Sequence, residues 1–140
     1  MPDLPPGLPE GAEIASTGGF NRFIGPLYRL PDAQGAAARF AFVAAEKHMN
    51  SAGSVHGGML MGFADIAMSR TSRQVSGAPR CSTVSLTADF VGPARLGDVI
   101  EARTTVTRRS RSLVFLSAEI TAGDRVILIA QGLWKIAGEA

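Results

Sequence analysis

The sequence has little of the residue types on which several protein classes depend. Its 140 residues include one cysteine, Cys81, and two histidines, His48 and His56. One cysteine cannot form an internal disulfide, and so few thiol and imidazole groups exclude a cysteine-rich zinc site. We therefore expect no metal site. We also expect a structure that is stabilised by its hydrophobic core and a protein that resides in a reducing compartment.

Long apolar runs and targeting signals are also missing. The longest aliphatic run, 126–130, is far shorter than the roughly 18 residues that predict a membrane span. Four prolines fall within the first nine residues, with no basic or apolar stretch beside them, so we expect an irregular lead-in over 1–12 and no secretory signal. These features predict a cytoplasmic protein that does not bind membranes.

Neither sign of charge is in large excess. Fourteen Lys and Arg offset twelve Asp and Glu, for a net charge of +2. Apart from Arg108, Arg109 and Arg111, the basic residues are scattered, which is not typical of a nucleic-acid-binding face. The hydrophobic fraction of 46% is too high for a disordered chain. The length suits one domain, which we place at 13–140.

A change in hydrophobic periodicity divides this domain. Between about 57 and 75, apolar residues recur at spacings of three and four on more than one side, which predicts a helix enclosed by other structure. Gly62 weakens this helix by about 1 kcal/mol relative to alanine, so we expect a close packing contact there. Residues 13–23 are ambiguous, and Gly18-Gly19 argues against a helix among them.

In the segments around the helix, apolar and polar residues alternate, which predicts strands. The expected strands are 24–30, 37–45, 82–91, 99–108, 113–120 and 126–136. The order strand–strand–helix–four strands is an α+β arrangement. It predicts one long central helix wrapped by a curved antiparallel sheet of about six strands.

The residues that could carry chemistry gather in the segment 50–58. Motifs for nucleotide hydrolysis, zinc hydrolysis and serine-elbow catalysis are absent. Gly57 and Gly58 enter the predicted helix and expose its first backbone N–H groups, which have no intrahelical partner and lie at the positive end of the helix dipole. That favours an anion or oxyanion site. The alternative is that the two glycines only permit a tight turn into the helix.

Asp65 is a carboxylate among apolar residues of the same helix. There a charge costs free energy unless it is paired, so Asp65 is either a general base or nucleophile, or a structural residue satisfied by a hydroxyl or an arginine. Gly57 and Asp65 are about 12 Å apart along the helix axis, and one reacting carbonyl cannot reach both. If both serve one reaction, Asp65 must meet Gly57 of a second subunit across antiparallel helices, as in a two-fold homodimer.

This pattern resembles that of hotdog-fold acyl-CoA thioesterases of the phenylacetate-pathway (PaaI-like) type. The shared residues are Asn50-x5-His56-Gly57-Gly58-x6-Asp65, followed by the strand-like 82–86 and the turn 92–98, and the resemblance covers about 20–136. It implies a hotdog fold and a cytoplasmic homodimer that pairs into a homotetramer, a dimer of dimers. The implied reaction is hydrolysis of an acyl-CoA thioester to a carboxylic acid and coenzyme A.

The resemblance also implies roles for individual residues. Gly57 would donate its N–H to the thioester oxyanion, and Asp65 would activate water or attack directly. Asn50 would orient the water or the thioester, and Thr83 would place a hydroxyl beside the carboxylate. The expected substrate-binding residues are His56, Gly58, Met59, Met61, Phe63, Met68 and Arg80. No metal or other cofactor is implied, because coenzyme A is part of the substrate.

Two other functions stay open. A hotdog dehydratase or hydratase would need a histidine base at the pocket, and the chain has no Asp-x-Asn-Pro-x-His motif. A non-catalytic acyl-CoA-binding protein would keep the fold without the chemistry. Exchange of Asp65 for asparagine separates such a binding protein from a hydrolase.

Overall fold

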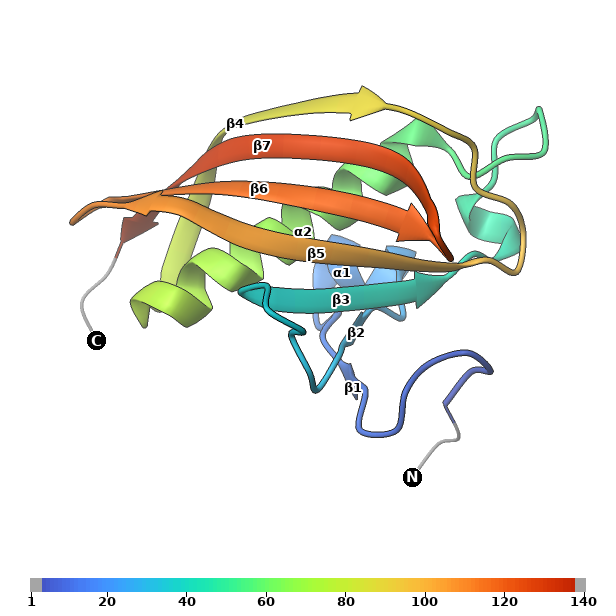
Figure 1. The fold of residues 1–140 in the computed structure, drawn as a ribbon, viewed down its shortest axis with the longest axis horizontal. Coiled ribbons are helices and arrows are strands. Elements are labelled where there is room, and N and C mark those ends of the chain that lie inside the picture. The colour runs from blue at the N-terminus through green and yellow to red at the C-terminus, as the bar shows by residue number, and fades with distance from the viewer. Residues whose placement is uncertain (1–3, 138–140) are drawn as a thin grey trace.

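The computed structural model describes residues 4–137; positions 1–3 of the expected lead-in and 138–140 of the expected domain lie outside the described residues. One long helix, α2 (Gly57–Ser76), is wrapped by a curved antiparallel sheet of seven strands (Figure 1). This confirms the predicted architecture, with one strand more than the six or so expected. No helix in the described range is long and apolar enough to cross a membrane.

The seven strands do not follow one another in chain order across the sheet. Their order is β1 (Glu13–Ile14), β2 (Tyr28–Arg29), β3 (Ala38–Val43), β5 (Val99–Arg109), β6 (Leu113–Ala122), β7 (Arg125–Ala137) and β4 (Arg80–Phe90). The chain therefore leaves β3, passes through the short 3-10 helix η1 (Glu46–His48) and α2, and enters the sheet again at its far edge. In the described part of the chain, β4 pairs with β7 on one side and with no strand on the other.

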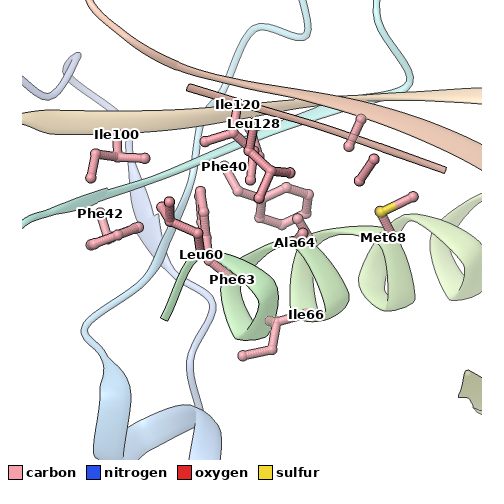
Figure 2. Packing of buried hydrophobic residues seen from close by; sticks show 14 of the residues in the cluster. Phe40, Phe42, Leu60, Phe63, Ala64, Ile66, Met68, Ile100, Ile120 and Leu128 are labelled. Atoms are coloured by element: carbon pink, nitrogen blue, oxygen red, sulfur yellow. The ribbon is translucent and has the colours of Figure 1, made fainter. Parts of the chain in front are cut away.

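The core lies between α2 and the sheet. Ala64 and Met68 point from the helix toward the sheet, whereas Ile66 lies on the opposite side of the helix (Figure 2) and is still buried. Phe63 packs edge-on against Phe42 of β3, with 4.8 Å between the ring centroids. Burial on both sides confirms that the helix is enclosed, as its periodicity predicted.

The N-terminal segment differs from the sequence-based expectation. A short helix, α1 (Gly19–Ile24), follows Gly18, whose φ of 74° turns the chain into it. Gly18 therefore precedes the helix, Gly19 begins it, and neither prevents it, because glycine adopts positive φ without steric cost. α1 lies against α2 at Gly62, where an added Cβ would be 3.5 Å from Phe20 and 3.6 Å from Ile24. The close contact expected at Gly62 is confirmed, and the strand expected at 24–30 shortens to β2.

Candidate active site

Asn50 orders the loop that leads into α2. Its side-chain oxygen accepts hydrogen bonds from the backbone N–H groups of Ala52 at 2.9 Å and Ser54 at 3.1 Å, and its amide nitrogen donates to the Ser54 hydroxyl at 3.0 Å. An asparagine amide has two N–H donors, so one remains for another partner. The structure therefore gives Asn50 a clear part in shaping the loop.

The amino end of α2 presents one unpaired donor. His56 is the N-cap residue, and its Nδ1 accepts the Gly58 N–H at 2.8 Å. Nδ1 is therefore unprotonated, and the cap satisfies one of the N–H groups that a helix start leaves without a partner. The Gly57 N–H makes no hydrogen bond within residues 4–137. Of the two glycines, it is Gly57 that offers a free donor at the positive end of the helix dipole.

Asp65 and Thr83 come together although they are 18 residues apart. The Thr83 hydroxyl on β4 donates to Oδ1 of Asp65 in the middle of α2 at 2.6 Å. Asp65 is half-buried, and over the described range it has no salt bridge to a basic residue. A single hydroxyl thus orients the carboxylate and leaves its other oxygen available for chemistry.

The four predicted catalytic residues form two groups within one chain. Asn50 and Gly57 lie at the amino end of α2, and Asp65 and Thr83 lie about 12 Å further along its axis. Phe90, at the end of β4, covers one side of the first group, because an added Cβ at Gly57 would be 3.1 Å from its ring. The fold of one chain does not bring the two groups to one reacting atom.

The residues predicted to bind substrate lie in different surroundings. Met59 is buried at the first turn of α2, and Met61 is half-buried. Phe63 and Met68 have no exposed surface, because the core between helix and sheet takes up both side chains. The packing thus differs from the expectation that these two line an acyl pocket. Arg80 is exposed beyond the carboxyl end of α2, roughly 30 Å along the helix from Gly57.

Ser69, one turn beyond Asp65, ties α2 to β4 and β7. Its hydroxyl accepts the indole N–H of the fully buried Trp134 at 2.7 Å, and its carbonyl accepts the Cys81 thiol at 3.4 Å. Burial raises the pKa of the Cys81 thiol, which disfavours the thiolate that a nucleophile needs. Cys81 therefore belongs to the packing around the site and not to its chemistry.

Comparison with known proteins identifies the family. The family model described as "Thioesterase superfamily" matches residues 52–129, a range that contains Gly57, Asp65 and Thr83. The protein of Pseudomonas aeruginosa named "Putative esterase PA0474" is 33% identical over 81% of this chain and 84% of its own length. The chain belongs to the thioesterase superfamily.

Further relatives agree with this membership. The human protein named "Acyl-coenzyme A thioesterase 13" is 34% identical over 62% of this chain and 62% of its own length. The structure of the E. coli PaaI protein from the phenylacetic acid degradation operon matches with a TM-score of 0.68 over 74% of both chains, at 21% identity. That structural likeness confirms the fold. The chain is a thioester hydrolase with the hotdog fold.

Phe90 is not among the residues that the sequence of this thioesterase marks as functional. The contact joins the end of a strand to the start of a helix 33 residues earlier in the chain, and no local periodicity marks it. A large aromatic residue that stays 56% exposed at a strand end is recognisable only once the sheet order is known.

Proposed function

We propose that this thioesterase hydrolyses acyl-CoA thioesters to a carboxylic acid and coenzyme A, at two equivalent sites of a homodimer. In each site the Gly57 N–H of one subunit binds the thioester oxygen, and Asp65 of the partner subunit supplies the base or nucleophile. Two features carry the proposal: the Gly57 N–H has no partner within residues 4–137, and Thr83 orients the Asp65 carboxylate at 2.6 Å.

Each group has a chemical task that its surroundings support. As the C=O oxygen gains negative charge, a fixed N–H at a helix start stabilises it. The Asp65 carboxylate takes a proton from water that attacks the carbonyl carbon, or attacks that carbon itself and is released by water. By either route the C–S bond breaks, the acyl carbon gains a hydroxyl and the sulfur leaves as the coenzyme A thiol. The remaining N–H of Asn50 is a donor that can orient the water or the thioester.

The dimer follows from the separation of the two groups. When two α2 helices lie antiparallel with Asp65 opposite Gly57 of the partner subunit, the two-fold axis passes beside Met61, midway between them. Met61 is half-buried and open to such a contact. The unpaired edge of β4 lies alongside, with Val84 and Phe90 each 56% exposed. An open strand edge with apolar residues favours pairing with another chain.

A further pairing of dimers would use a different surface. The outer face of the sheet carries Ile129, which is 43% exposed, with Phe115 and Leu133 half-buried near it. Contact between two such faces would give the expected homotetramer, a dimer of dimers, and sedimentation analysis measures its mass directly.

Release of coenzyme A thiol from a panel of acyl-CoA substrates tests the reaction. We expect hydrolysis by the wild type and at least a 100-fold lower kcat for Asp65→Asn, because asparagine can neither accept the proton nor attack. Equal activity of both proteins would overturn the role of Asp65. If neither protein releases thiol from any substrate, hydrolysis of acyl-CoA thioesters is overturned and the non-catalytic binding protein is favoured.

Subunit mixing tests the shared site. Gly57→Pro removes the N–H while keeping the helix start, because proline suits the first helical position and the ψ of 135° at His56 suits the residue before proline. In a mixed dimer of Gly57→Pro and Asp65→Asn subunits, one of the two sites has both wild-type groups. After random exchange of two inactive proteins we expect about one quarter of wild-type activity. No recovery, with exchange verified by mass, would place the whole site in one chain.

A further inference from the structure

A cavity opens beside the amino end of α2 on the side of α1. Its volume is about 360 Å³, and its walls come from three segments that are distant in sequence: α1, the η1 loop and the first turn of α2. The main lining residues are Phe20, Phe23, Ile24, Met49, His56 and Met59. A concave, mostly apolar pocket of this size is typical of a small-molecule site.

The cavity adjoins the proposed oxyanion donor. His56 and Gly58, the neighbours of Gly57 on both sides, lie in its wall. Phe90 does not line this cavity, and its ring is 3.1 Å from the position of an added Cβ at Gly57. A thioester whose oxygen binds the Gly57 N–H therefore has both Phe90 and this cavity close to it.

Some polar groups of the wall are already engaged within the protein. Both ring nitrogens of His48 are engaged, with the Ala45 N–H at 3.0 Å and the Ile24 carbonyl at 2.6 Å. The Lys47 amine donates to the Phe23 carbonyl at 3.0 Å. The polar groups that stay open are the remaining Lys47 donors and the second ring nitrogen of His56, and the rest of the lining is mostly apolar.

The outer wall leaves aromatic surface in water. Phe20 and Phe23 of α1 are 62% and 76% exposed, although burial of a phenylalanine side chain is worth roughly 1.5–3 kcal/mol. An apolar occupant would cover part of both rings. At about 30 Å³ per water molecule, the cavity has the volume of roughly a dozen waters, which is enough for a phenyl ring or a medium aliphatic chain.

We propose that this cavity binds the acyl group of the thioester, and that α1 selects apolar acyl groups larger than acetyl. The proposal rests on the proposed function, because it takes the Gly57 N–H as the point that fixes the carbonyl. Phe23 is a specificity-determining residue of the outer wall. Met59 is the one methionine, among those expected to contact the acyl group, that lines this cavity.

The test compares kcat/KM for acetyl-CoA, octanoyl-CoA and phenylacetyl-CoA in wild type, Phe23→Ala and Phe23→Leu. We expect Phe23→Ala to lower kcat/KM about tenfold for the two large substrates and less than twofold for acetyl-CoA, since only large groups bury the ring. Phe23→Leu should recover most of the loss. Leu96→Ala is the matched control, because Leu96 is also a half-exposed apolar residue (52%) but lies in the loop after β4. It should change none of the three values.

A binding measurement separates failure of this proposal from failure of the proposed function. S-octyl-coenzyme A, a thioether that cannot be hydrolysed, is titrated into each protein by calorimetry beside S-ethyl-coenzyme A. One outcome is that the wild type hydrolyses nothing but binds the octyl compound more tightly than the ethyl one, and that Phe23→Ala abolishes this difference. That result would support the cavity as the acyl site and overturn hydrolysis as the function. If hydrolysis is strong but neither assay depends on Phe23, the cavity assignment is overturned and hydrolysis stands.

Discussion

The two ends of α2 are built in opposite ways. At the carboxyl end, Gly77 donates its N–H to the Arg73 carbonyl at 2.7 Å, and Arg109 donates to the Val75 carbonyl at 2.7 Å and to that of Ser76 at 3.5 Å. At the amino end, one side-chain cap satisfies Gly58 and leaves Gly57 without a partner in the described range. One end is closed by the protein, and the other keeps a donor free.

The difference shows how one helix can serve stability and chemistry at once. The last carbonyls of a helix need partners, and supplying them from within the chain stabilises the fold. An N–H left open at the other end weakens the fold slightly. In the proposed function this N–H is already aimed at the ligand oxygen and needs no rearrangement during reaction. Substitutions at the two ends should therefore separate activity from stability.

The largest effect is expected for Gly57→Pro. Loss of the proposed oxyanion donor should lower kcat by roughly 100- to 1,000-fold with little change in Tm. The matched control is Gly57→Ala, which brings a Cβ to the same 3.1 Å contact with Phe90 but keeps the N–H. Steady-state kinetics and thermal melts on both proteins measure the two quantities. An equal loss in Gly57→Ala would trace the effect to crowding against Phe90.

A smaller effect is expected from substitution of His56, the N-cap residue of α2. His56→Ala removes the acceptor of the Gly58 N–H, which should destabilise the protein by about 1 kcal/mol. Fraying of the first turn should also move the Gly57 donor and lower kcat by about tenfold. His56→Asn keeps a capping oxygen and should recover both, as denaturant unfolding and kinetics would show. If His56→Asn recovers stability but not kcat, the imidazole has a task beyond capping.

Substitutions at the carboxyl end of α2 should affect stability alone. Gly77 has a φ of 74° and no atom within 4 Å of an added Cβ, so Gly77→Ala should cost about 1 kcal/mol through backbone strain only. Arg109→Ala should cost about as much by freeing the Val75 carbonyl. Both variants should keep wild-type kcat/KM. A fall in activity larger than the loss of folded protein would contradict the separation of the two ends.

The smallest effect at neutral pH concerns His48, which fastens the η1 loop to α1. Burial, with a smaller contribution from Lys47, lowers the pKa of His48 below its ordinary value of 6.5, although the bond to the Ile24 carbonyl opposes this. Below pH 6.5 the unfolded chain then binds a proton more readily than the folded one, so the free energy of unfolding should fall as the pH decreases. Urea unfolding between pH 5 and 8 measures this, and His48→Gln should flatten the slope.

Much of the fold was predictable because its signals are local. The spacing of Leu60, Phe63, Ala64 and Ala67 gave the helix almost to its ends, since side chains three and four apart share one face. The alternation over 113–120 located β6 in the same way. The segment 13–24 was not predictable, because two glycines can precede a helix as easily as interrupt one. The contact of α1 with Gly62 decides which occurs.

The residues of the candidate site also differ in whether a local signal marks them. Gly57 and Asp65 stand out in the sequence, because a glycine at a helix start and a carboxylate among apolar residues are unusual locally. The 2.6 Å bond between Thr83 and Asp65 joins different elements, and only the family resemblance suggested it. The surroundings of Phe63 and Met68 were not predictable, because periodicity indicates that a residue is buried but not which residues it packs against.

By itself the sequence determined the central helix, the longer strands β3 to β7 and the two residues at which chemistry is expected. All of these depend on neighbours within a few positions along the chain. The tertiary structure decided the order of the strands, the open edge of β4, the closed and open ends of α2 and the cavity between α1, the η1 loop and α2. Those features depend on which distant segments come together to bury apolar surface, and that choice is made by the packing of the whole core.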